Sequence, residues 1–258
     1  MTRILVIRAN ETRHRALVSK LMRDGFQVFQ IVQPKAPVVS GVTSLMANHF
    51  YARNQFEMDY FQYLQLPEMD LRSTLYSSSL DTAEVHGFAT ESNPEYVITF
   101  GCSILREDWI QNFANKILGV HLGLSPYYRG SGTNFFPFVN DELGAIGFTL
   151  MNLDRGVDTG NIVHQRYAEI VQGDSIHSIG NRLLQSMFED ISRLLRSKVK
   201  LNEGVAQPQN NLARIYKRRD FTEGTLLMAL ENLRTGAVDR FLRNKEEERQ
   251  RFPLLRVV

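Results

Sequence analysis

The stretch 4–32 alternates strand, helix and strand patterns, and it constrains the fold more than any other part of the chain. Ile4–Ile7 is a short, mostly β-branched apolar run that predicts a buried strand. Residues 11–24 place apolar side chains at helical spacing, and Gly25 follows where a C-cap glycine is expected. Gln27–Val32 predicts a second strand. A strand, a helix and a strand in this order form a βαβ unit, which requires a pair of parallel strands.

The alternation continues to about residue 200, so we predict a Rossmann-like, doubly wound α/β fold with a mostly parallel sheet. Further strands are predicted at residues 95–100, 117–122, 147–153 and 162–170, and further helices at 45–66, 82–92, 106–115 and 175–198. After residue 201 a linker at 204–212 leads to a predicted helix at 221–242 and a charged stretch at 244–252 that we expect to be solvated. The sequence therefore predicts an α/β domain at 1–203 and a small, mainly helical C-terminal extension at 204–258.

The bulk composition limits the kinds of partner that the chain can have. Its 258 residues carry a formal net charge of only +2, and no basic stripe of the kind that nucleic-acid binding needs stands out. The single cysteine, Cys102, rules out an internal disulfide and fits a reducing cytoplasm. We find neither a signal peptide nor a membrane-spanning apolar stretch. We therefore expect a cytoplasmic protein that binds neither nucleic acid nor membranes.

The strand predicted at 117–122 carries His121 near its carboxyl end, and a specialised loop follows it. Ligands of parallel sheets bind at this edge, and the glycines at 123, 130 and 132 let the backbone approach a ligand closely. Two interpretations are open. His121 is either a core histidine whose nitrogens bond to backbone groups, or a histidine that takes part in chemistry.

A second strand, at 147–153, runs into a loop that contains Asp154 and Asp158. Such an Asp- and Gly-rich segment is common as a turn between strands. The alternative is that one aspartate reaches His121. A carboxylate bonded to an imidazole fixes its tautomer and stabilises the imidazolium, which equips histidine for proton transfer.

Two motifs in this region point to a known family. Residues 121–130 read His-x-x-Leu-x-Pro-x-Tyr-Arg-Gly, and residues 147–162 read Gly-x-Thr-x-x-x-x-Asp-x-Gly-x-Asp-Thr-Gly-x-Ile. In this order they resemble the formyltransferases that use 10-formyltetrahydrofolate, whose members act on glycinamide ribonucleotide, methionyl-tRNA or amino-sugar nucleotides. The resemblance covers roughly residues 3–200 in organisation and 95–165 in motif. It implies formyl transfer to a primary amine, with His121 and Asp158 as catalytic residues and with no metal.

The resemblance implies where the formyl donor lies, and the residues after His121 indicate where the acceptor lies. The formyl donor, 10-formyltetrahydrofolate, is expected against Phe100, Gly101, Ser103, Ile104, Leu105, Leu153, Asp154, Gly156 and Val157. The acceptor is expected against Arg129, Gly130, Ser131, Gly132, Thr133 and Asn134. In this second group, Arg129 is either a surface cation or a residue that meets an anionic part of the acceptor, and the backbone at 131–133 offers donors for a small anion.

The choice of acceptor rests on elimination. The loop at residues 8–13 lacks the glycine-rich phosphate loop of the enzyme that acts on glycinamide ribonucleotide. The part of the chain after residue 203 is shorter than a tRNA-binding domain would need, and the low net charge agrees. An amino-sugar nucleotide is therefore the predicted acceptor. A 10-formyltetrahydrofolate hydrolase and a non-catalytic ligand-binding homologue are the alternatives.

One residue departs from the family pattern. The family has an asparagine two residues before the histidine, where it donates a hydrogen bond to the formyl oxygen as negative charge develops, and this chain has Gly119. Loss of such a donor costs about 10²–10³ in rate. Asn134, Asn152 or a water could supply the donor instead, the reaction could be slow, or the chain could bind a ligand without transferring a formyl group.

Three further features have open interpretations. The aromatic tract at 49–63 is core, a lid or a homodimer face, and the helix at 221–242 is core or a homodimer face. His164 and His177 are too isolated to indicate a metal site, and we expect them to be structural or surface residues.

Overall fold

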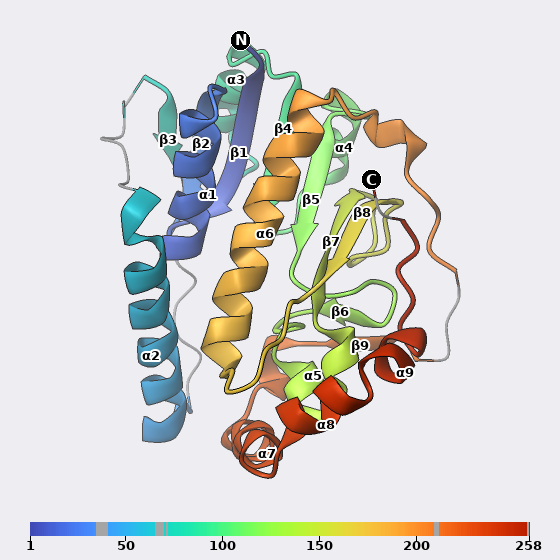
Figure 1. The fold of residues 1–258 in the computed structure, drawn as a ribbon. Helices are drawn as coiled ribbons and strands as arrows, with labels where there is room; N and C mark the ends of the chain where they lie inside the picture. Colours follow the sequence, from blue (N-terminus) through green and yellow to red (C-terminus); the bar gives the residue numbers. More distant parts are fainter. Residues whose placement is uncertain (35–40, 65–69, 71, 209–211, 257) are drawn as a thin grey trace.

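The structure, a computed structural model, describes residues 1–34, 41–64, 70, 72–208, 212–256 and 258 (Figure 1). Its strands are β1 (Arg3–Ala9), β2 (Gln27–Gln33), β3 (Thr74–Tyr76), β4 (Tyr96–Phe100), β5 (Ile117–His121), β6 (Tyr128–Gly130), β7 (Gly147–Asn152), β8 (Ile162–Tyr167) and β9 (Arg214–Tyr216). Its α-helices are α1 (Thr12–Arg23), α2 (Ser44–Phe61), α3 (Ala83–Glu91), α4 (Glu107–Asn112), α5 (Phe136–Val139), α6 (Ile176–Arg196), α7 (Glu223–Arg234), α8 (Ala237–Arg243) and α9 (Lys245–Gln250). Short 3₁₀ helices lie at Gln62–Leu64, Leu143–Ala145, Leu201–Glu203 and Arg218–Asp220.

A seven-stranded sheet forms the centre of the molecule, in the order β3-β2-β1-β4-β5-β7-β8. The first five strands in this order pair in parallel, whereas β7 is antiparallel to both β5 and β8. The prediction of an α/β fold with a mostly parallel sheet is confirmed. The antiparallel pairing of β7 with β8 follows from the chain path, because a short loop joins them and a parallel pair would need a crossover.

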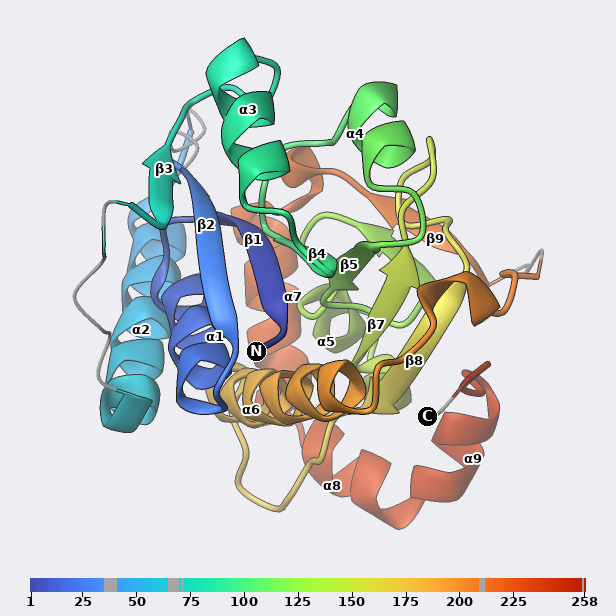
Figure 2. The same cartoon turned by 90° about the horizontal axis from the view of Figure 1, so that it is seen from above.

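Helices cover both faces of this sheet (Figure 2). α1, α2 and α6 lie on one face, and α3 and α4 lie on the other. The side chains of β1 alternate between the two resulting cores. Ile4 and Val6 join the cluster that includes α1 and α6, while Leu5 and Ile7 join the cluster around Trp109 of α4. A strand buried on both faces reads as a continuous apolar run, as residues 4–7 do.

Two expectations for the C-terminal part are wrong. The predicted helix at 221–242 is broken into α7 and α8 at Gly236, whose φ of +89° lies in the left-handed region that a helix interior excludes. The charged stretch at 244–252 contains α9 and is only partly solvated, because Phe252 is fully buried in the main core. The predicted helix at 45–66 ends at Phe61, and residues 65 and 66 lie outside the described part, as do residues 209–211 of the predicted linker.

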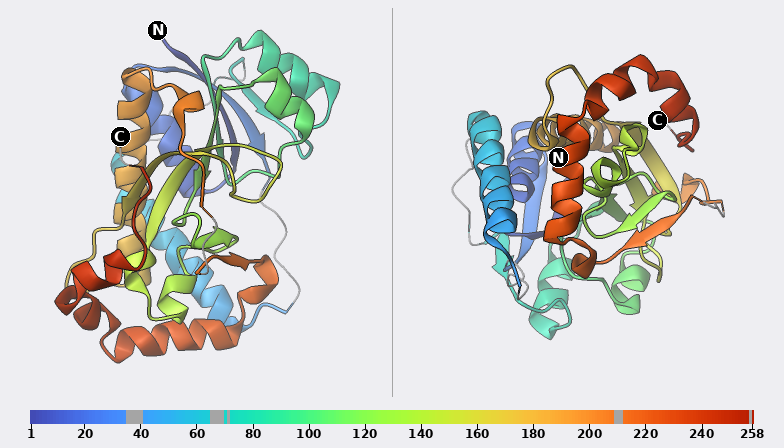
Figure 3. Two further views of the ribbon diagram at one scale, coloured as in Figure 1. Left: turned by 90° about the vertical axis from the view of Figure 1, so that its right-hand side faces the viewer. Right: turned by 90° about the horizontal axis from the view of Figure 1, so that it is seen from below.

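Residues after 203 pack closely against the rest of the chain. Leu226, Ala229 and Phe241 belong to the same apolar cluster as β1 and α6. At the lower end of the molecule, α7 lies beside α5 and α2 (Figure 3). β9 pairs in parallel with β6, the short strand that follows β5 in the chain. The boundary at residue 203 stays a prediction, but the C-terminal extension shares its core with the α/β part.

The aromatic tract of α2 is divided between core and surface. Phe61 is buried, whereas Tyr51 is 68% exposed. Whether the exposed part forms a homodimer face stays a prediction. None of the helices within the described residues combines the length and the apolar character needed to cross a membrane.

Candidate active site

His121 is the last residue of β5, and its ring lies between two hydrogen-bond acceptors. Its Nε2 lies 2.8 Å from the carbonyl oxygen of Tyr128, and its Nδ1 lies 3.3 Å from Oδ2 of Asp158. A carbonyl and a carboxylate only accept, so the doubly protonated imidazolium is the form that donates to both. The residue is only 6% exposed, so these contacts fix the orientation of the ring. The arrangement holds the imidazole in one orientation, with an acceptor facing each of its nitrogens.

Asp158 is held by its own backbone as well as by its side chain. Its φ of +53° lies in the left-handed region, which aspartate tolerates better than most residues. The backbone amide of Gly130 donates to its Oδ2 at 2.7 Å, and the side-chain amide of Gln207 donates to its carbonyl oxygen at 2.9 Å. The side chain remains 23% exposed beside the buried histidine. The predicted pairing of the two residues is therefore present in the geometry.

Two cavities meet at His121. The smaller, of about 170 Å³, is lined by His121 and Asp158 together with the ends of β4 and β7 and the loops that follow them. The larger, of about 410 Å³, is lined by His121 together with residues of α1, α2, α6 and the loop after β6. Because one imidazole belongs to both walls, a group bound in one cavity can reach a group bound in the other at this point.

The smaller cavity collects nearly all residues predicted to hold the formyl donor. Those that line it are Gly101, Ser103, Ile104, Leu105, Leu153, Asp154, Gly156 and Val157. Phe100 is the exception, since it lines the larger cavity. Gln33 fixes one wall by accepting from both the amide and the hydroxyl of Ser103. Asp154 fixes the other, because it accepts from the amide of Gly156 at 2.9 Å and from the Thr159 hydroxyl at 2.7 Å.

Gly119 also lines the smaller cavity, directly against Leu153. A Cβ at position 119 would lie 2.5 Å from Cδ2 of Leu153, so the leucine occupies the space that an asparagine side chain would need. Of the two asparagines considered as replacement donors, Asn152 directs its amide to the carbonyl oxygen of Leu201 and is not available. Asn134 lines the larger cavity with His121, and its buried Oδ1 has no hydrogen-bond partner within the described chain.

The larger cavity collects most residues predicted to hold the acceptor. Those that line it are Gly130, Ser131, Gly132, Thr133 and Asn134. Arg129 lines neither cavity, so the structure does not place it where the sequence suggested. It lies within β6, opposite Ile215 of β9. Side chains alternate along a strand, so residues 129 and 130 do not face the same way.

Sequence reasoning missed the charged wall of the larger cavity. Arg13 of α1 and Arg53 of α2 line it together with Glu57, which is 3% exposed and pairs with Arg13. Arg53 donates to Glu11 at 3.1 Å. The available signal was the four-residue spacing of His49, Arg53 and Glu57, which places them on one face of a helix.

Three histidines in this wall are held neutral. Burial lowers the pKa of His14 to about 3. Burial, with the neighbouring His177 and Arg53, lowers the pKa of His49 to about 4. Burial and nearby arginines also lower the pKa of His177, whose ring centroid lies 5.0 Å from that of His49. His177 is therefore part of a cavity wall and not an isolated surface residue.

His164 lies outside both cavities. Its Nε2 lies 2.9 Å from Oδ2 of Asp190, and its Nδ1 accepts from the amide of Val258, so it joins β8 to α6 and to the chain end. Among the described residues, no group of three or more His, Cys, Asp or Glu side chains could hold a metal ion.

Comparison with known proteins places the chain in a family. The formyl transferase family model matches residues 3–194. A methionyl-tRNA formyltransferase from Caldanaerobacter subterraneus is 30% identical over 120 residues, which cover 46% of this chain and 38% of that protein. Another from Finegoldia magna is 21% identical over 153 residues, covering 56% of this chain and 49% of that protein. The chain thus spans half or less of the length of these relatives.

Solved structures share the fold at lower identity. A sugar N-formyltransferase from a Shewanella species aligns with a TM-score of 0.57 and 13% identity, over 90% of this chain and 88% of that one. An N-formyltransferase from Helicobacter canadensis, solved with folinic acid and dTDP-3-aminofucose, aligns with a TM-score of 0.51 and 19% identity, over 86% of this chain and 73% of that one. Since the family model covers most of the chain, the chain belongs to the formyl transferase family.

Proposed function

We propose that the chain is an N-formyltransferase that moves a formyl group from 10-formyltetrahydrofolate to the primary amine of an amino-sugar nucleotide. The observation that carries the proposal is the position of His121, paired with Asp158, in the wall shared by two cavities. A group transfer between two bound molecules needs such a meeting point, because most of the rate gain comes from holding the reactants together.

The smaller cavity suits the formyl donor. Its walls combine apolar side chains, Ile104, Leu105 and Val157, with the backbone of residues 101–105. Ile104 is 82% exposed at the cavity edge, where a flat ring could cover it. A pterin ring has apolar faces and a polar edge, so it matches a wall that combines apolar side chains with backbone groups. The Helicobacter relative was solved with folinic acid, a related folate.

The chemistry follows from the charge on His121. The amine attacks the formyl carbon, and negative charge develops on the formyl oxygen. The positive charge of a protonated His121 stabilises this oxygen, and Asp158 keeps the ring oriented. The bond between the formyl carbon and N10 of the folate then breaks. The amine loses one proton and N10 gains one, so that no proton is consumed, and the partly exposed Asp158 carboxylate lies where it can relay this proton.

The larger cavity supports an acceptor that has an anionic part. The Nε atoms of Arg13 and Arg53 are buried and have no hydrogen-bond partner within the described chain, while Nε of Arg53 lies 3.8 Å from the Glu57 carboxylate. Buried donors of this kind gain most from a ligand that supplies acceptors, as a phosphate or a sugar hydroxyl does. The Helicobacter relative was solved with a nucleotide-linked amino sugar, which supports the same class of acceptor here.

An acceptor screen tests the proposal. The protein is incubated with 10-formyltetrahydrofolate and a panel of amino-sugar nucleotides and simple amines, and formyl adducts are detected by mass. We expect an adduct with at least one amino-sugar nucleotide. Formate release in the absence of any amine would identify a hydrolase instead. Folate binding without turnover on any acceptor would identify a non-catalytic homologue, as Gly119 suggests.

A further inference from the structure

The short strand β6 contacts both members of the proposed catalytic pair through its backbone. The carbonyl of Tyr128, its first residue, accepts from His121, and the amide of Gly130, its last residue, donates to Asp158. A shift of this strand would therefore move the histidine and the aspartate relative to each other. What holds β6 in place is part of the active-site geometry.

The C-terminal extension holds β6 from its other side. β9 pairs in parallel with it, and the amide of Arg214 donates to the carbonyl of Tyr127 at 2.8 Å. At the other end, the amide of Ser131 donates to the carbonyl of Tyr216 at 2.8 Å. The approach is so close that a Cβ on Gly130 would lie 2.1 Å from that same carbonyl oxygen. The extension is thus bonded to β6 at both ends.

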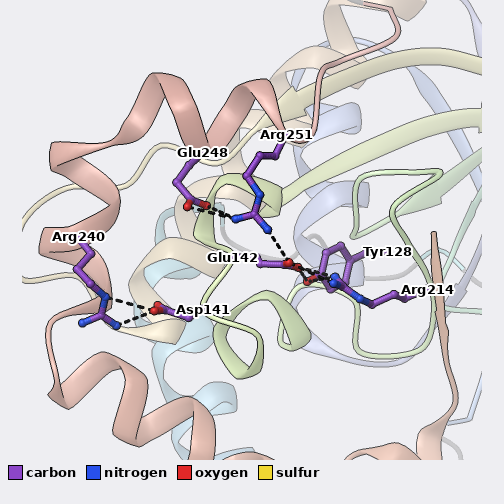
Figure 4. A network of polar contacts seen from close by, with 7 residues as sticks. All are labelled: Tyr128, Asp141, Glu142, Arg214, Arg240, Glu248 and Arg251. Atoms are coloured by element: carbon purple, nitrogen blue, oxygen red, sulfur yellow. Dashed lines mark hydrogen bonds and ion pairs between the residues drawn. The ribbon is translucent and has the colours of Figure 1, made fainter. Parts of the chain in front are cut away.

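Side chains reinforce this contact through one buried carboxylate (Figure 4). Glu142 accepts from the hydroxyl of Tyr128, from Arg214 of β9, and from Arg251 just after α9, the last at 3.0 Å. The Glu142 side chain is only 8% exposed, while both arginines reach it from the surface. Two cations from the extension thus fix a carboxylate that in turn holds the phenol of Tyr128.

The ring of Tyr128 is confined on all sides. It is fully buried, stacks on Tyr216 at a centroid distance of 5.8 Å, and lies 5.4 Å from the guanidinium carbon of Arg214. Asn140 donates to its hydroxyl oxygen at 2.8 Å. The phenol is thus held at its ring and at its hydroxyl, and the carbonyl of the same residue is the one that His121 contacts.

We propose that Arg214 and Arg251 of the C-terminal extension are positioning residues, which orient His121 through Glu142 and Tyr128. Neither arginine lines either cavity. The inference rests on the proposed formyl transfer for its effect on rate, but the orientation of the His121 ring can be measured without any activity.

The test compares Arg214→Met with Arg214→Lys by two readouts. The first is the imidazole resonances of His121 in protein labelled with nitrogen-15 histidine, assigned by their loss in His121→Ala. The second is the rate of formyl transfer. We expect Arg214→Met to shift the His121 resonances and to lower kcat by about tenfold to a hundredfold, with little change in the KM for the folate donor. Arg214→Lys keeps one charged contact and should recover part of both.

Arg240→Met is the matched control. Arg240 is also an arginine of the extension, and it pairs with Asp141, the residue next to Glu142, at 2.8 Å (Figure 4). Its pair does not lead to Tyr128, so its loss should leave the resonances and kcat unchanged. Equal effects of Arg214→Met and Arg240→Met would overturn the proposal, as would a folded Arg214→Met protein with wild-type His121 resonances.

Tyr128→Phe keeps the inference testable if Arg214→Met does not fold. It removes the hydroxyl that links the ring to Glu142 and leaves both arginine pairs in place. Shifted His121 resonances support the proposal, and unchanged resonances refute it. If the resonances shift in a protein whose wild type transfers no formyl group to any acceptor, the proposed function fails while the positioning role stands.

Discussion

The two cavities that meet at His121 are built in different ways. The smaller one takes nearly all its lining from β4, β5, β7 and the loops that follow them. The larger one brings together α1, α2, α6 and Phe221, which lie more than a hundred residues apart in places. The first is lined by apolar side chains and glycines together with Asp154, Asp158 and His121, whereas two arginines, two glutamates and further histidines line the second. The proposed function assigns the donor to the first cavity and the acceptor, which charged side chains would recognise, to the second.

The largest expected effect comes from the charge on His121, the residue that both cavities share. Asp158→Asn removes the carboxylate that faces Nδ1 of His121 but can still accept from the amide of Gly130. We expect kcat to fall by about 10²–10⁴-fold, with the protein as stable as the wild type. Steady-state kinetics with thermal melts measure both. Wild-type kcat in this variant would mean that the pair does not act in the chemistry.

The next effect separates the two asparagines. Asn134→Ala should lower kcat by about 10²–10³-fold if the side-chain amide of Asn134 takes the place of the asparagine that the family has at position 119. Asn152→Ala is the matched control, because its amide is bonded to Leu201 and it lines neither cavity. If the two variants have equal kcat values, Asn134 does not donate a hydrogen bond to the formyl oxygen.

The comparison between the cavities is tested by the KM values for the two substrates. Arg53→Met should raise the KM for the acceptor by about tenfold, because it removes a charged donor from the larger cavity. Ile104→Asp should raise the KM for the folate donor by about tenfold, since it places a charge against an apolar ring.

Each of these two variants should leave the KM for the other substrate unchanged. Arg23→Met, at the exposed end of α1, is the control for the loss of an arginine. A rise in both KM values in either variant would mean that the cavities do not bind the two substrates separately.

The smallest effect concerns stability and pH. In the folded protein the pKa of His49 is lowered to about 4 from an ordinary value of 6.5. The unfolded chain therefore takes up a proton that the folded one does not, and stability is lost as the pH falls from about 6.5 towards 4. His49→Phe keeps the aromatic packing and removes this titration. Its melting temperature should fall less between about pH 7 and pH 5 than that of the wild type. If the melting temperatures of the variant and the wild type fall in parallel, a group other than His49 causes the loss of stability at low pH.

The sequence was sufficient where the structure is local. The strands at 4–7, 95–100 and 117–122 follow from apolar runs. Asp158 as the partner of His121 was implied by the family resemblance and not by the strand pattern, because β7 is antiparallel to β5 and its carboxyl end does not adjoin His121. The residues of the smaller cavity were implied by the same resemblance. The position of Arg129 outside both cavities could not be predicted, because neighbouring strand residues face opposite ways and the register of β6 depends on β9.

Contacts between elements that lie far apart in the sequence could not be predicted. Arg53 and His177 come together only when α2 packs beside α6, and no local pattern specifies that packing. The charged stretch at 244–252 looked solvated because its one aromatic residue, Phe252, gave no sign that it enters the main core. The break at Gly236 was marked by a glycine, but glycine alone does not distinguish a tolerated helix position from a turn.

The most direct test of the central claim is formyl transfer by wild type and His121→Ala, measured by mass with 10-formyltetrahydrofolate and the acceptors that the wild type uses. The claim that transfer occurs where the two cavities meet predicts a loss of about 10²–10⁴-fold in kcat, with both substrates still bound. Transfer by His121→Ala at the wild-type rate to every acceptor would contradict it.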